Sequence, residues 1–187
     1  PRLAATQAVV LVVRDEDGSV STAAAELVDR LVAAGVRARL DDRVSTPFGR
    51  RATDWELKGV PLRIEVGPRD LADGQVVVVR RDEPGKVPVP ITGLSTLVPE
   101  LLDAIQRSLY EQALLLRESR ESAVAAAGAA EAAATGFARI PWATLGDGGV
   151  DQLGADAITV RCLVTADGDV PVSVDDDDLI AVVARSY

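Results

Sequence analysis

The sequence predicts an α/β protein, with a mixed sheet covered by helices in its first part and a second, smaller α/β domain at its end. Two observations lead to this fold class. An apolar run, a helical pattern and a second apolar run follow one another at the start of the chain. An alanine-rich tract at 123–134 then interrupts the pattern of packed elements. We therefore expect an α/β domain over 1–95, a long connecting helix over 96–134 and a C-terminal α/β domain over 135–187.

The first three elements form a strand–helix–strand unit. Residues 8–13 read Ala-Val-Val-Leu-Val-Val, which is typical of a strand buried on both faces. Leu27 and Leu31 recur on one face of the following helical pattern, and Gly35 stands where a helix commonly ends. Residues 36–40 give the second strand. Such a unit predicts parallel pairing with a right-handed crossover.

The middle of the chain alternates loops and short elements. Residues 43–51 are loop-like, and a short helix is expected over 52–58. The segment 61–66 places apolar residues on one face and Arg63 and Glu65 on the other, the pattern of a half-buried strand. Two further strands are predicted at 76–79 and 87–91. The second should lie at an edge because Pro88 and Pro90 cannot donate ladder hydrogen bonds.

The second half of the chain predicts one long helix and three strands. The helix should begin near Ser95 or Thr96, with an apolar stripe that includes Val98, Leu102 and Ile105. Strands are expected over 137–142, 157–164 and 179–184, with a polar, aspartate-rich connection over 165–178. These strands would form the C-terminal domain.

The composition argues against catalysis and metal binding by this chain. The sequence has no histidine and one cysteine, Cys162, which excludes histidine-based triads and four-cysteine metal sites. We expect Cys162 to be a buried apolar residue. An acidic turn, not a glycine-rich phosphate loop, follows the first strand, and the run 175–178 suits a solvated turn. We therefore assign no catalytic residue and no metal ligand.

The charge and the ends of the chain give further expectations. The net charge is −9, but residues 37–86 hold eleven basic and nine acidic side chains. This balance favours a surface that recognises shape and bases over one that binds phosphates by charge alone. No apolar run is long enough for a membrane span, so we expect a cytoplasmic protein without membrane contact. The chain starts with Pro1 and lacks methionine, which suggests part of a longer protein.

The densest group of charged residues lies in 54–70, DWELKGVPLRIEVGPRD. Arginine presents a planar donor fork that matches O6 and N7 of guanine, whereas glutamate and aspartate accept from base amino groups. A rigid surface with both kinds suits splayed single-stranded bases. The same spacing equally suits a surface ladder of salt bridges, so the pattern alone leaves both interpretations open.

This stretch also carries a family resemblance. Residues 55–71, WELKGVPLRIEVGPRDL, and residues 78–82, VVRRD, resemble the anticodon-domain signature of prolyl-tRNA synthetases of the eukaryote- and archaea-like type. Residues 137–142, FARIPW, and 184–187, ARSY, resemble the C-terminal domain of that subgroup.

The resemblance implies a mixed-sheet class IIa anticodon-binding domain and a small C-terminal domain. It also implies tRNA(Pro) as a partner, a homodimeric parent enzyme, and ATP- and magnesium-dependent chemistry in a separate catalytic domain. This segment itself would need no cofactor. The residues at matching positions, expected at the anticodon, are Glu56, Arg63, Arg69, Asp70 and Lys86.

The chain departs from the family pattern in two places. Ala52 stands where an aromatic residue that can stack on a base is usual, and Phe48 is a candidate substitute. Ala143 stands near the place of the first zinc-binding cysteine of the C-terminal domain. We therefore expect that domain to lack its zinc site and to keep its fold by apolar packing.

Two other functions remain open. The chain could be a free-standing tRNA-binding or regulatory module built on the synthetase fold. It could also be a protein–protein interaction domain that has lost RNA contact, which the negative charge would suit. The coding frame upstream of Pro1 discriminates between these alternatives and the synthetase, because only the synthetase requires a catalytic domain there.

Overall fold

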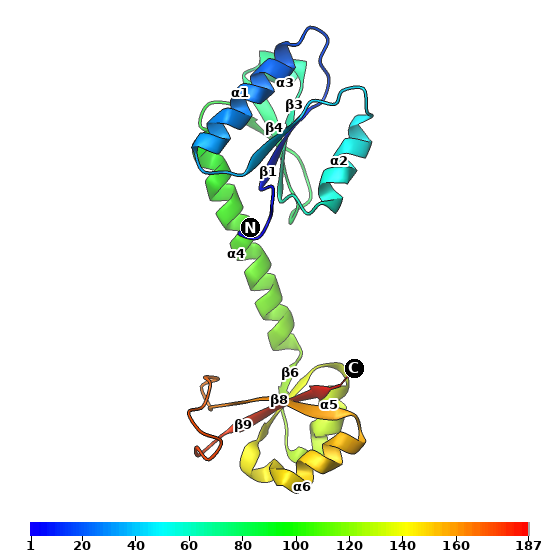
Figure 1. Ribbon diagram of the computed structural model, residues 1–187, viewed down its shortest axis with the longest axis vertical. Helices are drawn as coiled ribbons and strands as arrows, with labels where there is room; N and C mark the ends of the chain where they lie inside the picture. The colour runs from blue at the N-terminus through cyan, green and yellow to red at the C-terminus, as the bar shows by residue number, and fades with distance from the viewer. Residues whose placement is uncertain (187) are drawn as a thin grey trace. The chain divides into compact units, whose positions relative to one another are not determined.

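The computed structural model describes residues 1–186, apart from the side chain of residue 147. It divides the chain into two compact units, Pro1–Gln112 and the residues from Ala113 onward. The division falls inside the long helix α4, so each unit is described by itself (Figure 1).

Unit 1 is built on a five-stranded mixed sheet with the strand order β2-β1-β3-β4-β5. The β1 strand pairs in parallel with β2 and β3, and the pairs β3–β4 and β4–β5 are antiparallel. The parallel strand–helix–strand start and the edge position of the proline-containing strand are thus confirmed. The strands are β1 (Ala8–Val12), β2 (Ala38–Asp41), β3 (Leu62–Val66), β4 (Gln75–Arg80) and β5 (Val87–Pro90).

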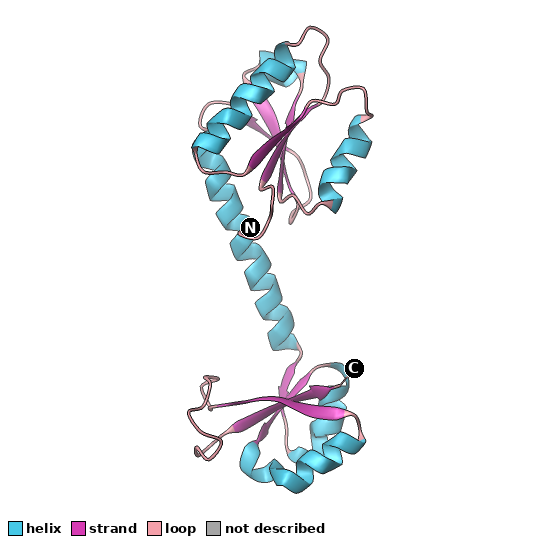
Figure 2. Cartoon of the chain, viewed as in Figure 1, coloured by secondary structure: helices cyan, strands magenta, loops and turns pink. Residues whose placement is uncertain are grey.

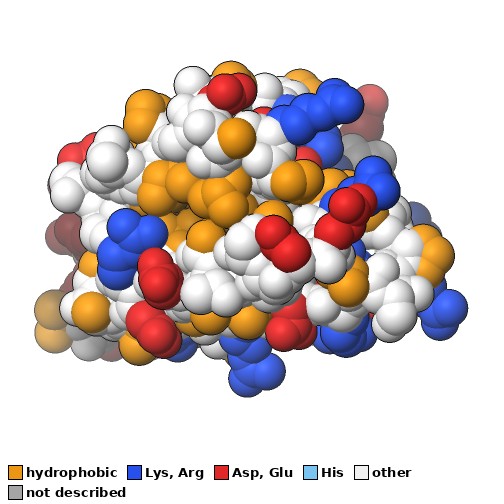
Figure 3. Space-filling model, turned by 90° about the horizontal axis from the view of Figure 1, so that it is seen from above, with side chains coloured by type: hydrophobic (Ala, Val, Ile, Leu, Met, Phe, Trp, Pro, Cys, Tyr) orange, Lys and Arg blue, Asp and Glu red, His pale blue; other side chains and the backbone are white. Residues whose placement is uncertain are grey.

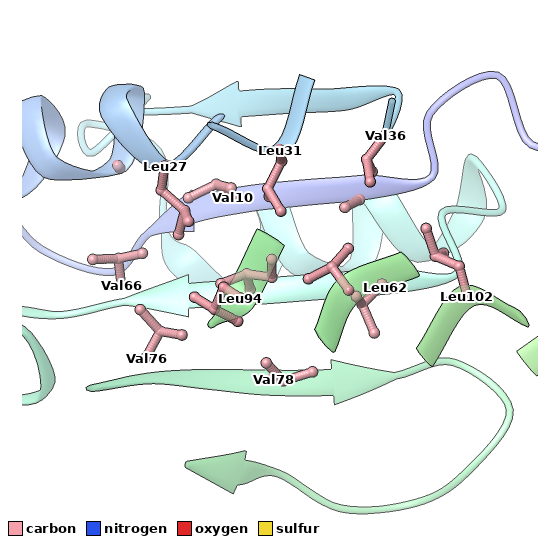
Figure 4. Close-up of a cluster of buried hydrophobic side chains, with 14 of the residues drawn as sticks. Val10, Leu27, Leu31, Val36, Leu62, Val66, Val76, Val78, Leu94 and Leu102 are labelled. Atoms are coloured by element: carbon pink, nitrogen blue, oxygen red, sulfur yellow. The ribbon is translucent and has the colours of Figure 1, made fainter. Parts of the chain in front are cut away.

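The two faces of this sheet are covered differently (Figures 1 and 2). On one face, α1 (Ser19–Ala33) and the first part of α4 (Leu94–Ser119) pack on a continuous apolar core. Leu27 and Leu31 of α1 and Leu94 and Leu102 of α4 meet the strand residues there (Figure 4). The short helix α3 (Pro68–Ala72) adds Leu71 to the edge of this core.

On the other face, α2 (Phe48–Leu57) covers a smaller apolar cluster. This cluster joins Val9 and Leu11 of β1 to Ala52 and Trp55 of α2. The strand β1 therefore contributes to both cores, and its side chains are 0% exposed along its whole length, as expected of its unbroken apolar sequence.

The second unit contains a four-stranded mixed sheet with the order β6-β7-β9-β8. Its core includes Ile140, Ile158 and Val183, with Ala129 and Ala133 packed from a helix. The elements are β6 (Glu121–Ala123), the 3-10 turn η1 (Ala126–Gly128), α5 (Ala129–Thr135), β7 (Phe137–Pro141), α6 (Trp142–Ala155), β8 (Ile158–Val164) and β9 (Ile180–Arg185).

Three expectations about these elements are wrong, and two helices were not predicted. The single helix expected over 96–134 ends at Ser119, and β6 and α5 occupy the rest of that range. The reason is a tertiary one: β6 pairs in parallel with β7, and this pairing overrides the helical propensity of the alanines. The segment 43–51 is not all loop, since α2 begins at Phe48. The helices α3 and α6 were not expected at all. Cys162 is exposed, because it lies next to a β-bulge on the edge strand β8.

Candidate nucleic-acid interface

The side-chain alternation of β3 brings charged groups onto the α2 face of the sheet. Arg63 lies between Val9 of β1 and Val79 of β4, and Glu65 lies between Leu11 and Val77. The helix α2 covers the β1 side of this face, whereas Val77 and Val79 on the β4 side stay only half-buried. This β3–β4 part of the α2 face is the candidate interface.

A connected set of charged side chains occupies the candidate interface. Arg63 donates from Nε to Oε1 of Glu65 at 3.0 Å and from Nη1 to Oε1 of Glu56 at 2.7 Å. Lys86 donates from Nζ to Oε2 of Glu65 at 2.6 Å. Three of the expected anticodon residues, Glu56, Arg63 and Lys86, are therefore brought together by a fourth residue, Glu65.

Exposure differs sharply within this charged cluster. The side chains of Glu65 and Arg63 are 6% and 12% exposed, whereas those of Glu56 and Lys86 are 55% and 56% exposed. Two groups are thus fixed at the base of the cluster, and two reach solvent. The salt-bridge ladder that the sequence pattern also allowed is present, and its outer members remain accessible to a ligand.

The candidate interface borders a hollow of about 530 Å³ between α2, the sheet and the β4–β5 turn. Glu56 and Arg63 form one part of its wall, and Arg81 forms another. Arg81 is exposed and, in the described part of the chain, its guanidinium makes no hydrogen bond or ion pair. The hollow therefore offers both a paired and an unpaired arginine to a ligand.

An aromatic ring lies beside the cluster. Lys86 Nζ is 5.4 Å from the ring centroid of Phe48, within cation–π range. Ala52, at the usual aromatic position, lies on the buried face of α2 and cannot present a surface to a base. Phe48 is half-buried at the start of α2, and its role as a stacking residue stays a prediction.

Arg69 and Asp70 belong to a different part of unit 1. They lie on α3, which follows the carboxyl end of β3 and packs Leu71 against the core on the α1 side. Arg69 is exposed and Asp70 half-exposed, and no side-chain hydrogen bond or ion pair links them to the cluster among residues 1–186. The structure therefore separates the five expected residues into a group of three and a group of two.

A buried polar network holds α2 in place. Arg51, 1% exposed, donates to the carbonyl oxygen of Val12 at 2.8 Å and that of Thr46 at 3.0 Å, and pairs with Asp41 at 3.3 Å. Trp55 Nε1 donates to Oδ2 of Asp41 at 2.6 Å. These bonds fix α2, which carries Phe48 and Glu56, relative to the ends of β1 and β2.

The carboxylate of Asp41 is the anionic centre of this network. Burial alone would raise the pKa of Asp41, but hydrogen bonds from Arg43 and Trp55 outweigh that effect and hold the pKa well below its ordinary value of 3.8. The group therefore stays ionised throughout the neutral range, and it keeps its two arginine partners.

Sequence reasoning missed two residues of this region. The alternation over 61–66 placed Glu65 beside Arg63, so its participation could have been inferred from the same pattern. The burial of Arg51 could not, because an arginine next to a loop-like segment gives no local signal of a distant backbone acceptor such as Val12.

Charge of both signs is interspersed on this protein. On the face seen in Figure 3, lysine and arginine side chains alternate with acidic ones around a patch of apolar side chains. Such a surface lacks the single-sign field of a phosphate clamp. No helix in residues 1–186 has the length and apolarity of a membrane span.

Metal ligands do not gather in the described part of the chain. Among residues 1–186, no group of three or more His, Cys, Asp or Glu side chains could hold a metal ion. A four-cysteine site does not fit a sequence with one cysteine, and the expected loss of the zinc site stays a prediction.

Comparison with known families gives one match that covers half of the chain. Residues 7–101 match a family described as "Anticodon binding domain". This range contains the whole sheet of unit 1 and all five expected site residues.

Curated relatives match the chain over its full length. It is 53% identical over 189 residues to a proline–tRNA ligase of Frankia casuarinae and 52% identical to proline–tRNA ligase 2 of Streptomyces avermitilis. In each case the match covers 100% of this chain and 40% of the relative. The chain thus spans less than half of the length of these ligases and corresponds to their C-terminal, anticodon-binding region.

Solved structures agree on the fold. Prolyl-tRNA synthetase of Cryptosporidium parvum, complexed with halofuginone and AMPPNP, aligns with a TM-score of 0.85 and 24% identity. The same enzyme complexed with L-proline and AMP gives a TM-score of 0.82 and 25% identity. These alignments cover the whole of this chain and 41% and 42% of the synthetase chains.

Proposed function

The chain belongs to the anticodon-binding domain family, and from that premise we propose that it recognises the anticodon of tRNA(Pro) as the C-terminal part of a prolyl-tRNA ligase. The catalytic domain is absent from this chain, so proline activation with ATP would take place elsewhere in a homodimeric, cytoplasmic parent enzyme. The observation that supports this proposal best is the cluster on the α2 face, where Arg63 and Glu56 form a donor–acceptor pair beside a hollow.

The chemistry of this pair suits guanine. In the free protein, Arg63 uses Nε for Glu65 and Nη1 for Glu56, and it makes no further side-chain hydrogen bond in the described region. A guanine can accept from the guanidinium through O6 and N7 and can donate from N1 and N2 to a carboxylate. Glu56 is more than half exposed, so it can exchange its bond to Arg63 for one to the base.

Arg69 and Asp70 offer a second pair of the same chemical type. They are adjacent on α3, and neither is engaged by another side chain among residues 1–186. Two donor–acceptor pairs on one unit suit two bases of a splayed single-stranded loop, which is how proteins usually read RNA sequence. Lys86 would add a positive charge near the first pair without specifying a base.

The proposal is tested by the affinity of the chain for two transcripts. One is tRNA(Pro), and the other is the same tRNA with its anticodon guanines replaced by adenines, both at one fixed salt concentration. We expect tighter binding of the first and nuclease protection of its anticodon loop. Equal affinities with no protection in that loop would contradict the proposal.

The same assay addresses the two other functions. A free-standing tRNA-binding module would show the same preference, and the reading frame upstream of Pro1 would then encode no catalytic domain. A protein–protein interaction domain would bind neither transcript above the level of an unrelated RNA. Retention of the complete polar signature over 54–70 favours RNA recognition over this last alternative.

A further inference from the structure

Glu65 is an unusual residue for an RNA-binding surface, because it is acidic and almost fully buried. The residue is 4% exposed and lies between Leu11 and Val77 of the neighbouring strands. A carboxylate removed from water in this way is destabilising unless it is paired and hydrogen-bonded. Its partners are Arg63 at 3.0 Å and Lys86 at 2.6 Å.

We infer that Glu65 is a positioning residue of the interface, which fixes the spacing and orientation of Arg63 and Lys86 before RNA binds. This inference rests on the proposed function. Glu65 uses its two oxygens for different partners, Oε1 for Arg63 and Oε2 for Lys86. One buried carboxylate therefore ties together a side chain of β3 and one from the β4–β5 connection.

The bond from Arg63 Nε matters most for base recognition. With Nε held by the buried Glu65, the guanidinium plane is fixed and the Nη1 and Nη2 edge remains for a ligand. Among the described residues, Nη1 is bonded only to Glu56, whose side chain is 55% exposed. The buried acid thus orients the arginine, and the exposed acid is the partner that a base can displace.

Prior orientation has a specific consequence for recognition. A fixed guanidinium can make two hydrogen bonds to one guanine edge without losing rotamer freedom on binding. A free one would still attract phosphates but would discriminate poorly between bases. Loss of Glu65 should therefore reduce selectivity between anticodons. Because the substitution removes a negative charge, overall RNA affinity should stay the same or increase.

The test compares Glu65→Gln with Asp82→Asn. The side chain of Asp82 is 2% exposed and binds Arg80 at 2.7 and 3.1 Å, and its carboxylate also has a hydrogen bond with Ser108 of α4. Both substitutions remove one negative charge from a buried, arginine-binding carboxylate of unit 1. Glu65 holds Arg63 and Lys86 of the charged cluster, whereas Asp82 holds Arg80, which lines the neighbouring hollow but bonds to no member of that cluster in the described residues.

The measured quantity is the ratio of the affinities for tRNA(Pro) and for its guanine-to-adenine anticodon variant. We expect this ratio to fall about tenfold in Glu65→Gln, the size of one lost bidentate base contact, and to stay unchanged in Asp82→Asn. If Glu65→Gln fails to fold, Glu65→Asp replaces it in the test. Its shorter side chain cannot reach both cations, so it should also lower the ratio. An unchanged ratio in a folded Glu65 variant would overturn the inference.

A second measurement needs no RNA and separates the inference from the proposed function. The NMR signal of Arg63 Nε–H, assigned by its loss in Arg63→Lys, should exchange slowly with water in the wild type and rapidly in Glu65→Gln. An unchanged exchange rate would refute the positioning role even if the wild type selects tRNA(Pro). If the exchange changes as expected but the wild type shows no selectivity, the positioning role stands and the proposed function fails.

Discussion

The two faces of the sheet in unit 1 are stabilised in different ways. The face under α1 and α4 is closed mainly by apolar side chains, including Val10, Ile64 and Val78. The α2 face has a small apolar cluster under the helix and relies on the buried Asp41–Arg51 network and on the charged cluster around Glu65. A single strand, β3, serves both faces, with alternate residues in the core and in the proposed interface. Side-chain alternation within this one strand therefore places core residues on one face and the charged residues of the candidate interface on the other.

The largest expected effect on stability comes from breaking the network behind α2. Arg51→Ala removes four hydrogen bonds and leaves Asp41 with fewer partners in a buried position. Removing one member of a buried ion pair typically destabilises a protein by about 3–5 kcal/mol. Urea unfolding of this variant should show a loss of this size. A loss below about 1 kcal/mol would mean that α2 is held mainly by its apolar contacts.

A smaller effect on stability is expected for Ile64, the residue of β3 that faces the core under α1 and α4. Ile64→Val removes one buried methyl group between the two interface residues of β3, from a side chain that is 0% exposed. Such a change costs about 1 kcal/mol. Because Ile64 points away from the interface, the ratio of affinities for the two tRNA transcripts should not change. A change in that ratio would show that the two faces are coupled.

A further effect is a pH dependence that belongs to the α2 face. Because the folded pKa of Asp41 lies below its ordinary value of 3.8, its contribution to the free energy of unfolding is complete above that value. It is lost as the pH falls through the folded pKa. The stability difference between the wild type and Asp41→Asn should therefore narrow between pH 5 and pH 2. Urea midpoints at each pH provide the measurement, and a difference that widens on acidification would contradict the assigned pKa shift.

Hydrophobic patterns in the sequence predicted the strands whose own residues carry a clear pattern. The unbroken apolar run gave β1, and the alternation over 61–66 gave β3 together with the outward position of Arg63. The sequence pattern did not predict the helix α6, because its glycines have low helical propensity and Gly146 interrupts the helix with a φ of 54°. The strand β6 was not predicted either, because it has only three residues, which are too few for a periodic pattern, and it forms by pairing with β7.

The candidate site was predicted in type but not in arrangement. The resemblance indicated Arg63, Glu56 and Lys86, whereas the carboxylate that joins the two cations, Glu65, required the register of β3 with its neighbours. The separation of Arg69 and Asp70 from that cluster also depends on a helix, α3, that follows a Gly-Pro break and is only five residues long. Short elements of this kind are set by tertiary packing.

We propose that Arg63 recognises a base of the proline anticodon. The most direct test of this claim is the ratio of affinities for tRNA(Pro) and its anticodon variant in the wild type, Arg63→Ala and Arg30→Ala, where Arg30 lies on α1 and serves as the control for the loss of one positive charge. We expect Arg63→Ala to lower the ratio by about 1–3 kcal/mol in free energy and Arg30→Ala to leave it unchanged. If Arg63→Ala folds and keeps the wild-type ratio, Arg63 has only a structural role and the claim is wrong.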